Sequence, residues 1–113
     1  MCGILGMVFA DPGREIDPHE LDAPLQAIVH RGPNGEGRLV RKGIAAGMRR
    51  LAIIDLEGGD QPIWNETRTV AVLYNGEIYN HKQLRAFCEE RGHRFATDSD
   101  TEVIVHLYEE LGD

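Results

Sequence analysis

The order of residue patterns along the 113-residue chain predicts an α+β fold. Apolar runs rich in β-forming residues come in clusters, and segments with helical periodicity stand between these clusters instead of alternating regularly with them. No repeat, low-complexity tract or interdomain linker is visible. A chain of this length buries roughly 60 to 70% of its unfolded surface. We therefore expect one domain in which sheets are flanked by helices.

The first apolar run, residues 4–9, predicts a buried strand that ends at the turn 11–13. After this turn, Pro18 at a first helical position indicates that a helix follows. The helix is either kinked at Pro24 or starts at Asp22, because proline disrupts a helix interior.

The middle of the chain predicts a glycine-rich loop over 30–37 and then several strands. The predicted strands are 37–41, 44–48, 50–55 and 69–74. The last of them is the clearest, because it is rich in β-forming residues. It ends at Asn75-Gly76, a pair typical of a tight turn.

Two helices are predicted in the last third of the chain. One should begin near Asn80 and stop at Gly92, with Leu84, Phe87 and Cys88 on its inner face. The other should begin with a capping box formed by Ser99 and Glu102 and end at Gly112. Its predicted apolar face consists of Val103, Ile104, Leu107 and Leu111.

Composition excludes several classes of function. Nineteen acidic residues against twelve basic ones give a net charge of −7, which opposes binding to nucleic acid or to anionic lipid. The first apolar run has no basic residue before it and soon meets a turn, so it predicts neither a signal peptide nor a membrane span. Cys2 and Cys88 are far apart in sequence, so we expect no disulfide and a cytoplasmic location.

The histidines have no spacing typical of metal ligands, so we predict no metal site. The residues concerned are His19, His30, His81, His93 and His106.

Cys2 is a candidate nucleophile. Removal of Met1 would leave a thiol and a free α-amine on one residue. Their ordinary pKa values are about 8.5 and about 7.7 to 8, so the amine can accept the thiol proton and return it to a leaving group. Taken alone, these residues favour an ordinary small apolar residue at a frayed chain end over a nucleophile.

Five stretches, in this order, resemble the N-terminal glutaminase domain of the class II glutamine amidotransferases. They are residues 1–4, 30–33, 50–55, 75–80 and 99–103. Within that class, the Arg-Gly-Pro loop, the Arg-Leu-Ala-Ile-Ile-Asp strand and the Asn-Gly-Glu-Ile-Tyr-Asn turn are similar to those of glutamine-hydrolysing asparagine synthetases. The resemblance implies the N-terminal-nucleophile hydrolase fold, an αββα sandwich of antiparallel sheets.

The resemblance also implies a reaction and a role for each site residue. The implied reaction is hydrolysis of L-glutamine to glutamate and ammonia through a thioester on Cys2. The side chain of Asn75 and the backbone N–H of Gly76 would stabilise the oxyanion. Arg50 would bind the substrate carboxylate, and Asp100 the substrate ammonium. The other implied glutamine contacts are backbone atoms of Leu51, Ala52, Ile53, Ile54 and Glu77.

Each polar site residue also has a structural alternative. Asn75-Gly76 could be a simple hairpin turn. Asp100 could stabilise the N-terminus of a helix, with an effect of about 0.3 to 1 kcal/mol. Arg49 is expected to be a solvated charge, but a register shift of one residue would exchange it with Arg50.

By the same resemblance, residues 1–113 are the N-terminal portion of a glutamine amidotransferase type 2 domain. The strands that complete the family's core and the synthetase domain are then absent. We expect no cofactor in this chain, because ATP and Mg²⁺ belong to the synthetase domain, which would use the ammonia to make asparagine. An incomplete sandwich should expose apolar sheet surface and self-associate.

Alternative functions remain open at this point. The chain could be a catalytically inert interaction or structural module, or it could serve a relative with a different acceptor. It could also hydrolyse another amide, although Arg50 with Asp100 favours a free amino acid.

Overall fold

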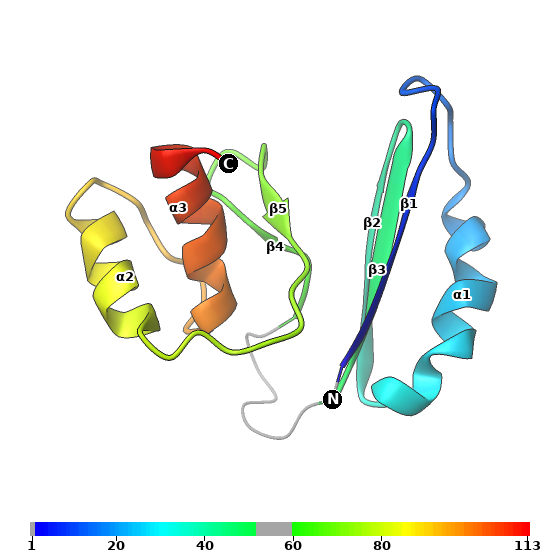
Figure 1. Ribbon diagram of the computed structural model, residues 1–113, viewed down its shortest axis with the longest axis horizontal. Coiled ribbons are helices and arrows are strands. Elements are labelled where there is room, and N and C mark those ends of the chain that lie inside the picture. The colour runs from blue at the N-terminus through cyan, green and yellow to red at the C-terminus, as the bar shows by residue number, and fades with distance from the viewer. Residues whose placement is uncertain (1, 52–59) are drawn as a thin grey trace.

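The computed structural model describes residues 2–51 and 60–113, which form a mixed α+β fold with two antiparallel sheets (Figure 1). The larger sheet has the strand order β1-β3-β2, with β1 at Gly3–Val8, β2 at Gly35–Arg41 and β3 at Ile44–Arg50. The smaller sheet pairs β4, Ile63–Trp64, with β5, Ala71–Val72. The α+β prediction is confirmed at this level.

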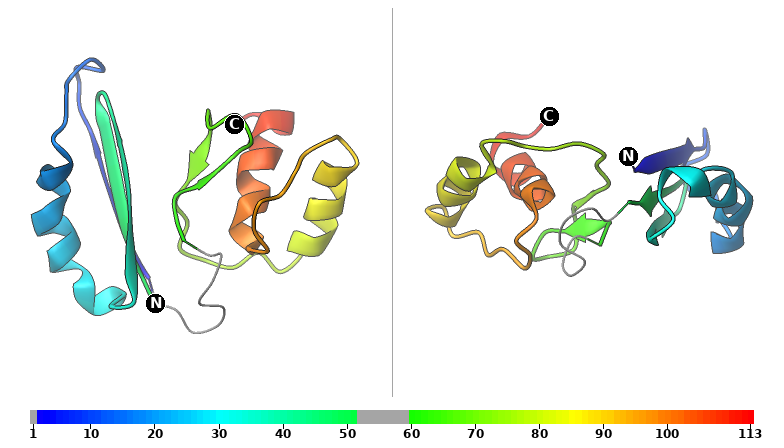
Figure 2. Two further views of the ribbon diagram at one scale, coloured as in Figure 1. Left: turned by 180° about the vertical axis from the view of Figure 1, so that it is seen from behind. Right: turned by 90° about the horizontal axis from the view of Figure 1, so that it is seen from below.

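Three α-helices in the described ranges accompany the sheets: α1 at Asp22–Ala27, α2 at His81–Glu89 and α3 at Val103–Leu111. Short 3₁₀ turns occupy Pro18–Leu21, Val29–Arg31 and Asp100–Glu102. α1 lies on the face of the larger sheet that points away from α2, α3 and the smaller sheet (Figures 1 and 2). None of the described helices has the length and apolar character needed to cross a membrane.

The main core lies between α1 and one face of the larger sheet. Its buried residues are Ile16, Leu21, Leu25 and Ala45, and Leu5, Met7, Phe9, Ile28 and Val40 pack against them. On the opposite face of β1, Ile4 is 50% and Val8 79% exposed. The prediction that residues 4–9 form a buried strand is therefore wrong for that face, because α1 covers only one side of the sheet.

The start of α1 selects one of the two alternatives left open by the sequence. α1 begins at Asp22, and Pro24 lies in its first turn, where a missing N–H removes no intrahelical bond. The preceding 3₁₀ turn begins at Asp17, which forms a capping box with Glu20.

The prediction of a loop over 30–37 is wrong at both ends. Residues 29–31 form a 3₁₀ turn, and 35–37 already belong to β2, where they pair with β3. A long antiparallel partner overrides the weak strand preference of glycine. At Gly37 the close approach requires glycine, because a Cβ would collide with the Gln61 carbonyl.

Two further strand predictions need correction. Arg50 ends β3 instead of starting a new strand, Leu51 lies outside any strand, and residues 52–55 lie outside the described residues. Of the predicted strand 69–74, only β5 forms, because β4 offers just two residues for pairing. A strand needs a partner for its backbone groups, whatever its composition.

The C-terminal helices match their predicted positions, but the contacts at the start of the last one do not. α2 follows Asn80, and the chain turns at Gly92 with φ +90°. The predicted capping box is not formed: Ser99 accepts from the N–H of Thr101, and Glu102 turns instead toward Ala96 and Thr97.

The predicted apolar face of α3 is correct only in part. Val103, Val105 and His106 are the buried residues of this helix. Leu111 is exposed, so it does not belong to the buried face.

Candidate functional site

Because successive side chains of a strand point to opposite faces, Cys2 and Arg50 lie on the same face of the larger sheet. Gly3 pairs with Arg49 across β1 and β3, so the neighbouring residues Cys2 and Arg50 share the face opposite α1. The side chain of Arg49 lies on the other face, where its Nε donates to the Leu25 carbonyl at 3.3 Å. The structure thus distinguishes the two arginines, and Arg49 is a half-buried contact to α1 and not a solvated charge.

A pocket of about 520 Å³ opens on this face. It is bounded by the ends of β1 and β3 and by the loops that precede α2 and α3. Its lining residues are Cys2, Met48, Arg50, Gln61, Tyr74, Asn75, Gly76, Glu77, Ile78, Tyr79, His81, Asp98, Ser99, Asp100 and Thr101. The volume is in the range of small-molecule sites.

Cys2 lies where two loops contact it. The N–H of Leu51 points at the Cys2 Sγ at 3.4 Å, and Nδ2 of Asn75 donates to the Cys2 carbonyl at 2.9 Å. An amide nitrogen carries two hydrogens, and this bond uses one of them. The thiol and the Asn75 amide are therefore held at the same point of the pocket.

Asp100 is tied to the loop that carries Asn75 and Gly76. Its Oδ2 accepts from the N–H of Ile78 at 2.7 Å, which joins the start of the last 3₁₀ turn to the segment before α2. Asn75-Gly76 does not form a hairpin, because α2 and not a strand comes next. A Cβ at Gly76 would lie 2.5 Å from the Tyr74 hydroxyl, so any other residue here would force the side chain of Tyr74 to move.

Gln61 is a site residue that the sequence analysis did not single out. Its Nε2 donates to the Tyr74 carbonyl at 3.0 Å, and the Tyr74 N–H donates to its Oε1 at 2.6 Å. One side chain thus satisfies both backbone groups of Tyr74, directly before Asn75. A glutamine followed by a proline is a common sequence pattern, so nothing in the sequence indicated this role of Gln61.

Opposite charges line the same pocket. Arg50 donates to Asp60 at 3.1 Å on the rim, and Asp100 is half-buried. A guanidinium and a carboxylate in one pocket are complementary to a zwitterion such as a free amino acid.

The structure brings six of the predicted site residues together in this pocket: Cys2, Arg50, Asn75, Gly76, Glu77 and Asp100. Leu51 contacts the thiol through its backbone. The remaining predicted contacts, Ala52, Ile53 and Ile54, lie outside the described residues.

Comparison with known proteins gives a consistent result. A family model described as a glutamine amidotransferase domain matches residues 1–113. The chain is 44% identical over 110 residues to asparagine synthetase [glutamine-hydrolyzing] 1 of Bacillus subtilis, covering 96% of this chain and 17% of that protein. It is 46% identical over 116 residues to asparagine synthetase [glutamine-hydrolyzing] of Zea mays, covering 100% of this chain and 19% of that protein. The chain thus spans about a fifth of the length of these relatives.

Proposed function

We propose that the chain hydrolyses L-glutamine to glutamate and ammonia. The starting point is that the chain belongs to the glutamine amidotransferase domain family. The observation that carries the proposal is the pocket in which the Cys2 thiol, the Arg50 guanidinium and the Asp100 carboxylate meet. A thiol supplies the nucleophile, and the two charges match the two ends of an amino acid.

The reaction proceeds in two steps. The Cys2 thiol passes its proton to the α-amine that removal of Met1 exposes, and the resulting thiolate attacks the side-chain amide carbon of glutamine. The tetrahedral oxyanion accepts hydrogen bonds from the Asn75 amide and the Gly76 N–H, and loss of such a donor raises the barrier by about 3 to 4 kcal/mol. Ammonia leaves with the proton held by the amine, and water then hydrolyses the thioester to glutamate and free thiol.

Substrate selection rests on the charged residues and on backbone groups. Arg50 binds the α-carboxylate, and Asp100, held in place by the Ile78 N–H, binds the α-ammonium. Backbone atoms of residues 51–54 and of Glu77 complete the contacts to glutamine. The bond from the Leu51 N–H to the Cys2 sulfur supports the contact proposed for Leu51, because the backbone of Leu51 lies beside the reacting atom.

The proposal extends to the fold and to a longer protein. The two antiparallel sheets correspond to part of an N-terminal-nucleophile hydrolase sandwich, and residues 1–113 to the N-terminal portion of the amidotransferase domain. If the chain belongs to a longer protein similar to these asparagine synthetases, the family resemblance implies that ammonia passes to a cytoplasmic, ATP- and Mg²⁺-dependent synthetase domain that aminates aspartate. A synthetase domain with another acceptor is the alternative.

Intact-mass spectrometry with an electrophilic glutamine analogue tests the site directly. The expected result is loss of Met1 and one adduct on Cys2, which an excess of glutamine prevents. Cys2→Ala should give no adduct and no ammonia release from glutamine. Full glutaminase activity in Cys2→Ala would end the proposed mechanism.

One observation favours a second function. Ile4, Val8 and Ile44, on the face of the larger sheet opposite α1, are exposed apolar side chains, as in an interaction module. Retained Met1, or the absence of any adduct, would favour an inert module over an enzyme.

A further inference from the structure

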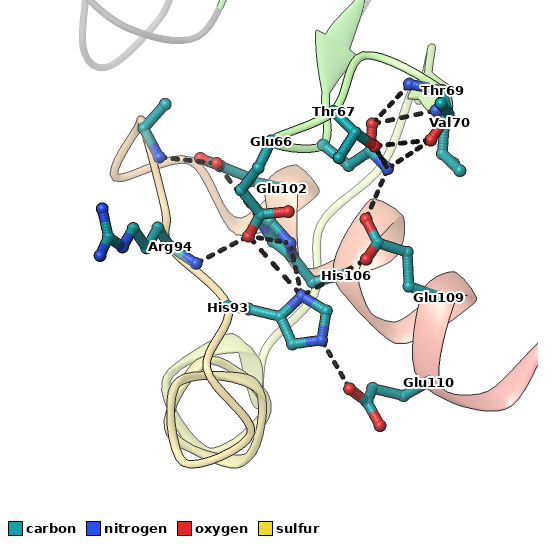
Figure 3. Close-up of polar contacts among 12 residues, drawn as sticks. Glu66, Thr67, Thr69, Val70, His93, Arg94, Glu102, His106, Glu109 and Glu110 are labelled. Atoms are coloured by element: carbon teal, nitrogen blue, oxygen red, sulfur yellow. Dashed lines mark hydrogen bonds and ion pairs between the residues drawn. The ribbon is translucent and has the colours of Figure 1, made fainter.

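Two histidines and two glutamates from separate segments meet outside the pocket that Cys2 lines (Figure 3). Glu66 lies between β4 and β5, His93 lies between α2 and α3, and His106 and Glu109 lie on α3. One ligand atom of each residue lies within 4.8 Å of the others. We call these four residues the His–Glu cluster.

Four distances within the His–Glu cluster are close to those around a tetrahedral metal ion, although the full set of ligand atoms spreads over 4.8 Å and must contract around an ion. The two Nδ1 atoms lie 3.1 Å apart, and the His106 Nδ1 lies 3.3 Å from Oε1 of Glu66. The His93 Nδ1 lies 3.7 Å from Oε1 of Glu66 and 3.8 Å from Oε2 of Glu109. Four nitrogen and oxygen ligands at 2.0 to 2.1 Å from zinc are separated from one another by about 3.3 to 3.4 Å.

The outer nitrogen of each imidazole faces a carboxylate. Nε2 of His93 lies 2.7 Å from Glu110, and Nε2 of His106 lies 3.4 Å from Glu102. A carboxylate at this position holds the ring proton on Nε2 and leaves the Nδ1 lone pair available, as in carboxylate–histidine–zinc sites. With both rings in this tautomer, two lone pairs face each other among carboxylate oxygens, an arrangement that a bound cation stabilises.

The carboxylates of the His–Glu cluster are also held in place. Glu66 accepts from the N–H of Arg94 at 2.7 Å, and Glu109 accepts from the side-chain amide of Asn65. The side chains of His106 and His93 are 0% and 7% exposed, whereas those of Glu66 and Glu109 are 33% and 32% exposed. An ion can therefore enter from the glutamate side.

We propose that the His–Glu cluster binds one divalent transition-metal ion, with Zn²⁺ as the best fit to its two nitrogens and two oxygens. Four protein ligands close the coordination shell, so the ion is structural and not catalytic. It joins α3 to the segment between the strands of the smaller sheet and to the segment between α2 and α3. This proposal departs from the sequence-based expectation of no metal and is independent of glutamine hydrolysis.

Calorimetric titration of the full chain with Zn²⁺ tests the proposal. The titration is done in a Cys2→Ser background, because a free N-terminal thiol competes for zinc. One ion per chain is expected, and His93→Gln should weaken binding at least about tenfold, since even residues that only orient a ligand change metal affinity by 10- to 100-fold. His19→Gln, a change in an exposed histidine of the other half of the molecule, should leave the affinity unchanged.

A second variant covers the case in which His93→Gln fails to fold. Glu109→Gln removes a ligand that is partly exposed, and exposed Glu90→Gln is its matched control. Co²⁺ bound in place of Zn²⁺ should show the intense visible absorption of a tetrahedral site, and this absorption should be absent in Glu109→Gln.

Three results would overturn the metal site. They are no saturable binding, binding that neither variant weakens, and a melting temperature that responds to acid but not to zinc or a chelator. The last result would mean that a proton shared between the two imidazoles is the cation.

Discussion

At the scale of single residues, the adjacent arginines 49 and 50 illustrate how a one-residue shift changes function. Arg50 lines the pocket, whereas Arg49 contacts α1 on the far face of the sheet. Hydrogen bonds to charged groups contribute about 1.5 to 3 kcal/mol. We expect Arg50→Ala to raise KM for glutamine roughly 10- to 100-fold, with a smaller change in kcat.

Steady-state measurement of ammonia release checks this prediction. Arg49→Ala is the matched control, and it should lower stability while leaving KM nearly unchanged, because Arg49 bonds to the Leu25 carbonyl. A large KM effect in Arg49→Ala but not in Arg50→Ala would reverse the assignment.

The two cysteines should differ in reactivity. Cys88 is fully buried, and this burial, together with the charge of Glu110, raises the pKa of its thiol. We expect iodoacetamide to modify Cys2 in the native chain and to modify Cys88 only after denaturation. Peptide mass spectrometry at matched reaction times reads out both sites, and equal labelling of the two thiols in the native chain would contradict the prediction.

At the scale of elements, an ion pair joins the start of α1 to β2. Arg38 donates to Asp22 at 2.6 Å, and this hydrogen bond lowers the pKa of the Asp22 carboxyl below its ordinary value of 3.8. The folded pKa is depressed, so the stabilisation is complete above the ordinary pKa and is lost as pH falls through the folded pKa.

We therefore expect Asp22→Asn to lower the free energy of unfolding at pH 7, and the difference from wild type to vanish in strong acid. Urea unfolding at a series of pH values measures it. Asp113→Asn, at the exposed end of the chain, should show no such pH-dependent difference. A difference that persists at the lowest pH would mean that packing, and not charge, explains the effect.

The loop before α3 depends on one buried carboxylate. Glu102 is 1% exposed and accepts from the N–H groups of Ala96 and Thr97 at 2.7 Å each. Glu102→Gln would turn an amide donor toward these N–H donors, so we expect destabilisation by about 1 to 3 kcal/mol. Chemical denaturation measures this, with exposed Glu90→Gln as control. An unchanged unfolding midpoint would show that these bonds do not hold the loop.

At the scale of the whole molecule, the face of the larger sheet opposite α1 is only partly covered in the described residues, because Met48 is buried there but three other apolar side chains are not. Ile4, Val8 and Ile44 are exposed there, and Val8 lies directly opposite Ile44 in the β1–β3 register. Apolar sheet surface of this kind favours association between copies. We expect concentration-dependent self-association, which Val8→Lys should reduce.

Sedimentation velocity over a concentration series tests self-association. Ala86→Lys, on the exposed side of α2, adds the same charge elsewhere and should leave self-association unchanged. A wild-type chain that stays monomeric at high concentration would contradict the prediction.

The sequence by itself determined the local features of the fold. Asn80 and Gly92 flank α2, and Pro18 begins the first helical turn of the chain, as the capping and proline signals predict. These signals act over a few residues, so they can be read without a partner. The site residues could be predicted only as a set of motifs, because residues as distant as Cys2 and Asp100 meet only through folding.

The tertiary structure alone decided which partner each segment has. Strand pairing shortened the predicted strand 69–74 to β5, and loop contacts drew Glu102 away from its expected cap. Packing of α3 against the segment after α2 brought His93 beside His106. The spacing of these two histidines in the sequence does not indicate a metal site. The physical reason is common to all three cases. Polar groups of the backbone and side chains bond to the groups that the fold places beside them, and residues that are distant in the chain produce no local sequence pattern.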